Sequence, residues 1–344
     1  MHNFGYETTA AEVADAFSNQ IKGKTILITG PTPGGIGYTT AHTIASHNPH
    51  CLILAGRSLS TLSATKSSIL SSLPQGTNPP PIKLLVLDLA NLEQVREAAE
   101  EVNAYEEKVD VLINNAGVTG LGWGTGEAAG GKGVEKHFLI NHLGPFLFTN
   151  LLLPRMVDER GEKAERARVV MVASRGYRFG GVRFDDWNFE NGRAYVPVQA
   201  YAQSKSANIL CALSLAEKLK GKGLLAYSLH PGSIWTNISR HTKTEDLRLP
   251  GWTDQNRNLT DNGNVKWKTL EQGAATQVLA AFDPNIEGEF LKPRLHLLAN
   301  GDYLEDCAVR MDELKSIAPR LLDKGDAERL WKLSEELVGQ EFDY

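Results

Sequence analysis

The sequence has little of what marks membrane, secreted or nucleic-acid-binding proteins. No apolar run in its 344 residues approaches the ~20 residues of a membrane span. The first 24 residues lack the basic and then apolar order of a signal peptide. The net charge is −5, so there is no basic excess to bind a phosphodiester backbone. These absences predict a cytoplasmic protein with no membrane span and no nucleic-acid partner.

Cysteine is also scarce. The three cysteines, Cys51, Cys211 and Cys307, lie far apart, and the first two fall in apolar runs. This placement predicts small buried hydrophobic residues. It offers neither a disulfide framework nor a metal cluster, so we expect no metal. Internal repeats and low-complexity linkers are absent as well, which favours one continuous domain.

What the sequence does contain is an alternation of two kinds of apolar segment. Short β-branched runs predict strands, and stretches of helical periodicity between them predict helices. The predicted strands are residues 25–29, 51–55, 82–87, 109–113, 168–173 and 224–229. The predicted helices are residues 36–47, 60–72, 92–103, 134–157, 199–220, 269–282 and 327–338. This order is typical of an α/β fold whose parallel sheet is covered by helices on both faces.

The pattern also divides the chain. Residues 1–23 form an arm, in which Thr9 and Glu12 have the spacing of a capping box. We expect residues 24–310 to form the main domain and residues 311–344 a helical tail packed on it. Two stretches lack periodicity: the glycine-rich residues 120–133 predict a flexible loop, and the mostly polar residues 235–267 predict a lid.

The stretch TGPTPGGIG, residues 29–37, follows the first predicted strand and precedes a predicted helix. In this context a glycine-rich loop favours a dinucleotide site, because glycine lets the backbone approach the pyrophosphate and the helix N-terminus offers free N–H groups. The working glycines are either Gly30, Gly35 and Gly37 or Gly30 and Gly34. We favour the first count, which places Ile36 against the sheet; a plain turn is the alternative.

The end of the second predicted strand bears on the choice of dinucleotide. An NAD site carries an acidic residue near this point to bind the ribose 2′-hydroxyl. This chain has Gly56 followed by Arg57. An arginine makes a charge-assisted contact with a 2′-phosphate. The sequence therefore favours NADP over NAD, with a plain surface arginine as the alternative.

Polar residues gather where the later strands end. Residues 114–117, Asn-Asn-Ala-Gly, end the fourth strand; Ser174 ends the fifth; HPGSIWT, residues 230–236, ends the sixth. Tyr201 and Lys205, spaced i and i+4, project from one face of the helix before the sixth strand. Ligands of open parallel sheets bind at the carboxyl ends of the strands, so we expect these residues to meet in one site.

With this combination of motifs the chain resembles the short-chain dehydrogenases/reductases over residues 24–307. Within that family, INHLGPFLFTNLLLP, AYAQSKSANIL and TLEQGAATQ resemble the retinol dehydrogenases and the WW-domain oxidoreductases, without a WW domain. The resemblance implies a Rossmann-type doubly wound parallel sheet of about seven strands. It implies hydride transfer between NADP(H) and a carbonyl or alcohol group. It also allows a homodimer paired through the helices that carry Asn141 and Tyr201.

The resemblance assigns roles to matching positions. Tyr201 would be the acid–base group, Ser174 would orient the carbonyl, Lys205 would bind the nicotinamide ribose, and Asn141 would hold a proton-relaying water. Tyr201 would then need a pKa below its ordinary ~10, with Lys205 and oxidised nicotinamide as the expected causes. The residues expected to contact the cofactor are Gly30, Thr32, Gly35, Ile36, Gly37, Arg57, Ser58, Asp88, Leu89, Asn115, Ala116, Gly117, Tyr201, Lys205, Pro231, Gly232, Ile234 and Thr236.

The segments expected around the substrate are apolar and aromatic. They offer Leu121, Trp123, Tyr177, Phe179, Trp235 and Trp252, which predict a hydrophobic and bulky substrate. The alternative is that some of these aromatic residues pack in the core. Two other functions stay open at this point. One is an NADP-binding sensor without turnover, although Tyr201 and Lys205 are both intact. The other is an epimerase or dehydratase of the same fold, although such enzymes carry a longer C-terminal substrate domain.

Overall fold

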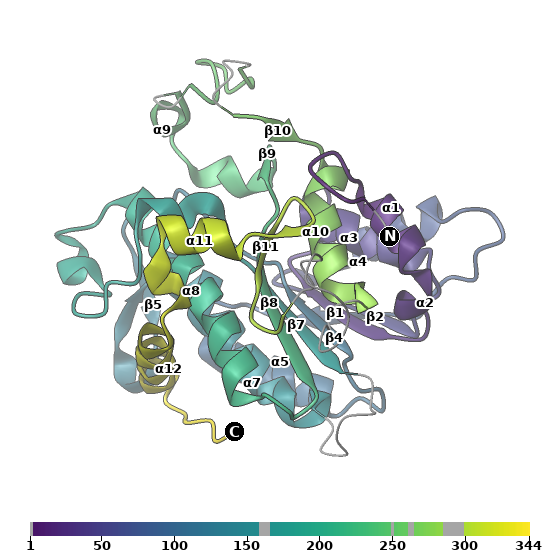
Figure 1. Ribbon diagram of the computed structural model, residues 1–344, viewed down its shortest axis with the longest axis horizontal. Helices are drawn as coiled ribbons and strands as arrows, with labels where there is room; N and C mark the ends of the chain where they lie inside the picture. Colours follow the sequence, from purple (N-terminus) through teal and green to yellow (C-terminus); the bar gives the residue numbers. More distant parts are fainter. Residues whose placement is uncertain (1–2, 158–165, 249–250, 261–264, 285–298) are drawn as a thin grey trace.

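A computed structural model describes residues 3–157, 166–248, 251–260, 265–284 and 299–344. At its centre an eight-stranded sheet has the order β12-β11-β8-β7-β4-β1-β2-β3 (Figure 1). Seven of these strands are parallel, and β12 runs antiparallel to β11. The strands are β1 Thr25–Thr29, β2 Cys51–Gly56, β3 Ile82–Val86, β4 Val111–Asn114, β7 Ala167–Val172, β8 Leu224–His230, β11 Tyr303–Glu305 and β12 Ala308–Val309. The doubly wound α/β fold is confirmed, and the strand beyond the expected seven is a two-residue edge strand.

The strand order reverses between β1 and β4. The chain first moves outward through β2 and β3 and then returns to β4 before it builds the other half of the sheet. In such sheets the loops on either side of the reversal diverge and leave a crevice at the carboxyl ends of the strands. The glycine loop after β1 and the Asn-Asn-Ala-Gly turn after β4 both open into that crevice.

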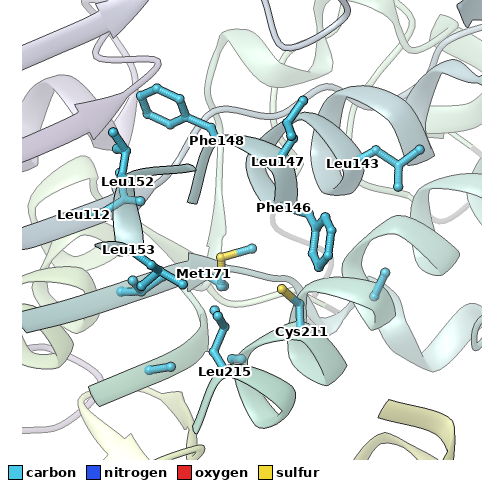
Figure 2. Packing of buried hydrophobic residues seen from close by; sticks show 14 of the residues in the cluster. Leu112, Leu143, Phe146, Leu147, Phe148, Leu152, Leu153, Met171, Cys211 and Leu215 are labelled. Atoms are coloured by element: carbon cyan, nitrogen blue, oxygen red, sulfur yellow. The ribbon is translucent and has the colours of Figure 1, made fainter. Parts of the chain in front are cut away.

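Side chains of the central strands alternate between two hydrophobic cores. Leu27 packs in one core, whereas Ile26 and Ile28 pack in the other. Helices α5 (Leu92–Asn103), α7 (Gly144–Met156) and α8 (Pro197–Lys218) cover the first face, and α3 (Ile36–Ala45), α4 (Leu59–Ser72) and α10 (Leu270–Phe282) cover the second. Figure 2 shows the first core, where leucine and phenylalanine side chains of α7 meet Met171 of β7 and Cys211 of α8. All three cysteines are buried and free, as predicted.

Two stretches near the site differ from the sequence prediction. Residues 120–133 contain more regular structure than the flexible loop predicted: strand β5 (Thr125–Glu127) pairs with β6 (Gly133–Glu135) in a small antiparallel sheet. The helix predicted over residues 134–157 is interrupted. It consists of α6 (Lys136–Phe138), a π-helical turn at Leu139–Leu143 and α7. A π-turn widens the helix by one residue locally and often marks a functional position.

The two ends of the chain pack on opposite faces. Helix α1 (Ala10–Ala16) begins with the predicted capping box of Thr9 and Glu12, and with α2 (Ser18–Ile21) it lies on the side of α3 and α10 (Figure 1). On the other side, α11 (Met311–Ile317) is followed by α12 (Lys324–Val338), which packs against α8. Beyond α12, the Tyr344 hydroxyl donates to the Asn150 carbonyl at 3.0 Å and the Phe342 ring meets Phe146 edge-on.

The lid segment, residues 235–267, leaves and rejoins the domain at one place. Its flanks are β9 (Ser233–Ile234) and β10 (Trp267–Lys268), which pair in parallel. Between them lie a 3-10 turn at Asn237–His241 and the short helix α9 (Thr244–Arg248), which stand above the rest of the molecule in Figure 1. Residues 249–250 and 261–264 of the lid lie outside the described residues. Among the helices described, none combines the length and apolar character needed to cross a membrane.

Candidate active site

A hollow of about 280 Å³ lies at the carboxyl ends of the strands. It is walled by the loops that follow β1, β2, β3, β4, β7 and β8, so it occupies the crevice that the strand order creates. The structure brings together in this hollow every residue predicted to contact a cofactor, except Ser58, together with Ser174. Those residues are Gly30, Thr32, Gly35, Ile36, Gly37, Arg57, Asp88, Leu89, Asn115, Ala116, Gly117, Tyr201, Lys205, Pro231, Gly232, Ile234 and Thr236.

The glycine loop has features of both predicted counts. Gly35 is the N-cap of α3, which begins at Ile36, and Gly37 lies in its first turn. Gly30 has φ +69°, and a Cβ there would lie 2.9 Å from the Ala116 Cα. Gly34 also has a positive φ, +77°, and so forms the turn that takes up the additional residue. The loop is therefore built for close approach of its own backbone to the strand end and to a ligand.

Three hydrogen-bonded side chains hold the loop from behind. The Asn115 amide donates to the carbonyls of Thr29 at 2.9 Å and Gly30 at 3.2 Å. Gln277 of α10 donates to the Asn115 side-chain oxygen at 3.1 Å, and Thr40 of α3 donates to Gln277 at 3.0 Å. A strand end and two helices thus fix the loop, and the Asn115 amide uses both its nitrogen and its oxygen in these hydrogen bonds.

Tyr201 lies at the inner end of the hollow beside Ser174. A Cβ on Gly176 would be only 2.9 Å from the Tyr201 ring, so the glycine lets the ring lie against the turn that follows β7. The Ser174 oxygen accepts a hydrogen bond from the Gly176 N–H at 3.0 Å. Burial raises the pKa of Tyr201, and a hydrogen bond with the Ser174 side chain opposes that rise. In the chain itself, Tyr201 is therefore a protonated phenol over the neutral pH range.

Lys205 is buried one helical turn from Tyr201. Its Nζ donates to the Val172 carbonyl at 2.8 Å and lies 5.8 Å from the centre of the Tyr201 ring. Burial lowers the pKa of Lys205 to about 8. The expected lowering of the Tyr201 pKa by Lys205 is not found in the chain alone, because burial dominates at Tyr201 and the ammonium group is turned toward a carbonyl.

Comparison with known proteins decides the family. Residues 24–185 match the family model described as short chain dehydrogenase. The chain is 33% identical over 329 residues to retinol dehydrogenase 14 of Mus musculus, covering 92% of this chain and 86% of that one. It is 32% identical to the chloroplastic short-chain dehydrogenase TIC 32 B of Brassica napus, covering 97% and 94%. The chain belongs to the short-chain dehydrogenase family.

Solved structures agree with this assignment at the level of fold. An uncharacterized protein from Mycobacterium Paratuberculosis superposes with a TM-score of 0.65 at 27% identity, covering 94% of this chain and 96% of that one. A short chain dehydrogenase from Salmonella enterica serovar Typhi superposes with a TM-score of 0.56 at 20% identity, covering 84% and 98%. This dehydrogenase is thus an oxidoreductase acting on CH–OH and C=O groups, in a family that binds a nicotinamide cofactor and with a sequence that resembles the retinol dehydrogenases.

Asn141 of the dehydrogenase lies within the π-helical turn and does not line the hollow. Its side-chain oxygen accepts from the Val118 N–H at 2.8 Å, and its amide donates to the Val118 carbonyl at 3.0 Å and to Ser204 at 2.9 Å. Both amide hydrogens are thereby used. The side chain therefore clamps the turn after β4, and the water-holding role expected for Asn141 stays a prediction.

The outer end of the hollow is positively charged. Arg57 lines it from the end of β2, and Arg240 lines it from the lid; both side chains are exposed. Neither arginine forms an ion pair with a carboxylate of the described residues. Burial lowers the pKa of His241, and the positive charges of Arg240 and Arg57 lower it further, so both arginines act on the same neighbourhood. Arg240 could not be predicted as a residue of the hollow, because the lid carries no motif.

Of the residues predicted at this end and in the substrate walls, Ser58 and Tyr177 do not line the hollow, and contact of Ser58 with a cofactor stays a prediction. The Ser58 hydroxyl caps α4 by accepting from the Thr61 N–H at 3.2 Å. Tyr177 is 2% exposed and packs edge-on against Tyr303 in the core, so it cannot touch a substrate. Trp123 and Phe179 are exposed, and Trp235 packs edge-on against Trp267.

Sequence reasoning also missed several apolar residues of the hollow. Val118, Ile140 and Ile238 line it together with the predicted Ile234, and His230 lies among them. Burial, with added effects of nearby cations, lowers the pKa of His230 to about 3, so its ring is neutral. Ile140 could have been found from its place beside Asn141, whereas Ile238 depends on the course of the lid.

Proposed function

We propose that this short-chain dehydrogenase transfers hydride between NADP(H) and the carbonyl or alcohol group of a hydrophobic substrate, with Tyr201 as the acid–base group. The observation that carries the proposal is the placement of Tyr201, Ser174 and Lys205 in the same hollow as the glycine loop. A proton donor and a second hydrogen-bonding group are what a carbonyl oxygen needs as it gains negative charge.

The residues present fit an NADP molecule. Gly30 and Gly37 pack against Ala116 and Asn115 so closely that no Cβ would fit, which fixes the glycine loop at the carboxyl end of β1. The N-terminus of α3 points free N–H groups and a favourable dipole at the same place. At the outer end, Arg57 and Arg240 offer two cations without carboxylate partners among the described residues. A phosphorylated ribose supplies the negative charge that such a pair favours.

Each side chain at the inner end has a distinct task. Tyr201 is protonated, so in the reductive direction its hydroxyl donates a proton to the carbonyl oxygen while carbon gains the hydride. When bound, the nicotinamide supplies or accepts that hydride at C4. Ser174 orients the carbonyl by a second hydrogen bond. Lys205, buried one turn away, bears a positive charge below its pKa of about 8 and, with its ammonium group beside the Val172 carbonyl, would bind the nicotinamide ribose.

The walls of the hollow support a hydrophobic substrate. Val118, Ile140, Ile234 and Ile238 present apolar surface beside Tyr201. Such walls suit a ligand that buries most of its own surface, with few polar groups to fix its orientation.

The test is a panel of small and bulky aldehydes, ketones and alcohols with NADPH, NADP, NADH and NAD, followed by nicotinamide fluorescence. We expect turnover of bulky apolar carbonyls with NADPH. Binding without turnover across the panel would contradict an oxidoreductase acting on these groups and favour a sensor. Turnover without net change in the redox state of the nicotinamide would favour an epimerase.

A further inference from the structure

Glu135 and His137 form a buried pair immediately behind the reaction centre. Both side chains have 0% exposure, and His137 Nδ1 lies 2.7 Å from Glu135 Oε1. The other carboxylate oxygen accepts from the Phe138 N–H at 2.9 Å. A fully buried carboxylate is costly unless each oxygen is hydrogen-bonded, so this pair is held in one arrangement.

The pairing sets which ring nitrogen of His137 carries hydrogen. Because a carboxylate only accepts, Nδ1 is the donor, and Nε2 of the neutral ring is free to accept. The Leu121 N–H donates to Nε2 at 3.3 Å. A second hydrogen on Nε2 would face this N–H and break the contact.

Tyr195 binds the other backbone polar group of Leu121, its carbonyl oxygen. Its hydroxyl donates to the Leu121 carbonyl at 2.8 Å and lies 3.4 Å from Glu135 Oε1. Burial and the negative charge of Glu135 raise the pKa of Tyr195, so the phenol keeps its proton and remains a donor. Both backbone polar groups of Leu121 are therefore held by side chains of this network.

The network of Glu135, His137 and Tyr195 contacts Tyr201 directly and is connected to the lid through the substrate loop. The His137 ring meets the Tyr201 ring edge-on, with centroids 6.2 Å apart. The substrate loop, residues 118–123, is fixed at its start by Asn141, which bonds both backbone groups of Val118. Further along, Gly120 packs so closely on Thr242 of the lid that no Cβ would fit. Trp123 then packs edge-on against Tyr195, with ring centroids 5.3 Å apart.

We propose that Glu135, His137 and Tyr195 are positioning residues that fix the substrate loop beside Tyr201, and that they thereby set the size of carbonyl substrate the enzyme accepts. This inference rests on the proposed function, because it concerns the same reaction. None of the three needs to touch the reacting atoms. They act through the backbone of Leu121, whose position determines how much room lies between the loop, the lid and the Tyr201 hydroxyl.

Tyr195→Phe is the mildest test, because it keeps the ring that packs on Trp123 and removes one hydrogen bond. We expect kcat/KM for bulky carbonyls to fall about tenfold, which corresponds to ~1.4 kcal/mol. We expect a fall of about twofold or less for small carbonyls, and NADPH affinity within about twofold of the wild type. Tyr227→Phe is the matched control, because the Tyr227 hydroxyl is buried and has no hydrogen-bond partner among the described residues.

A double-mutant cycle with His137→Gln separates positioning from general destabilisation. If Tyr195 and His137 both act through the backbone of Leu121, Tyr195→Phe changes the bulky-to-small ratio in the wild type and changes it less in the His137→Gln background. His137→Gln should shift the ratio in the same direction as Tyr195→Phe. An unchanged ratio in a folded Tyr195→Phe enzyme, or an equal change in both backgrounds, overturns the inference. Absence of carbonyl turnover in the wild type would instead refute the proposed function.

Discussion

Gly37 leaves open the space that the side chain of Asn115 occupies. Gly37 lies in the first turn of α3, and a Cβ at this position would collide with the amide nitrogen with which Asn115 holds the Thr29 and Gly30 carbonyls. The two residues come from different strand–helix units, so their fit couples the glycine loop to the end of β4. The shape of the hollow depends on this fit.

Gly37→Ala is therefore expected to displace Asn115 and with it the glycine loop. NADPH affinity should fall at least about tenfold, because one lost hydrogen bond to a buried carbonyl and a shifted loop together exceed ~1.4 kcal/mol. Nicotinamide fluorescence measures the NADPH affinity of the variant and the wild type. Gly181→Ala is the control, because a Cβ at Gly181 meets nothing within 4 Å. Unchanged NADPH binding by Gly37→Ala would mean that the glycine loop does not determine cofactor affinity.

Tyr201→Phe should abolish turnover and leave NADPH affinity within a few-fold. The substitution keeps the ring against Gly176 and removes the hydroxyl that is proposed to transfer a proton. Steady-state kinetics and fluorescence titration check the two parts separately. More than a tenth of the wild-type kcat remaining in Tyr201→Phe would mean that another group transfers the proton.

Arg57 and Arg240 should set the preference for NADPH over NADH. A hydrogen bond to a charged group is worth about 1.5–3 kcal/mol, so wild-type kcat/KM should favour NADPH by at least about tenfold. Gly56→Asp with Arg57→Leu should reverse the order, and Arg240→Gln should weaken NADPH binding more than NADH binding. Arg248→Gln, which removes an exposed charge from the same lid, is the control. Both arginines are exposed, so the preference should shrink at high salt. Equal use of NADPH and NADH at low salt would refute the predicted preference for NADPH.

Lys205→Met should abolish activity and yet stabilise the fold. Burial lowers the pKa of Lys205 from 10.5 to about 8, so keeping it charged costs free energy of folding. That cost is fully present below pH 8 and disappears as the pH rises toward 10.5, where the unfolded chain also loses the proton. Denaturant unfolding at pH 7 should show a gain of about 1–3 kcal/mol that shrinks with rising pH. Asn208 still donates to the Val172 carbonyl, at 3.3 Å.

Lys220→Met removes an exposed lysine just beyond the same helix and should change stability little at any pH. If Lys205→Met were less stable than the wild type at pH 7, the hydrogen bond to Val172 would outweigh the cost of burying the charge.

The strand ends could be predicted from sequence, because local chemistry specifies them. The six predicted strands all exist with ends shifted by at most two residues, since β-branched runs buried on both faces leave a clear signal. Gly30, Gly35 and Gly37 were found because a helix start and positive φ restrict residue choice. Tyr201, Ser174 and Lys205 were found because they are carried by helix and strand ends.

Features that depend on tertiary contacts could not be predicted. The π-helical turn at Leu139–Leu143 depends on how Asn141 reaches Val118 and Ser204, not on the periodicity of its own residues. Arg240 comes to the hollow through the course of the lid. Tyr177, an aromatic residue after Ser174, lies in the core because the turn directs it toward Tyr303. Short β11 gave no pattern long enough to recognise.

The C-terminal tail has a consequence for assembly. Helix α12 already lies along α8, and Phe342 and Tyr344 already cover α7, so the helices that carry Tyr201 and lead on from Asn141 are occupied within a single chain. The tail therefore covers the helices through which the resemblance allows two chains to pair. A pair of chains joined through these two helices would first have to displace both tails. We expect that shortening the chain before α12 would expose the surface of α8 that the tail covers.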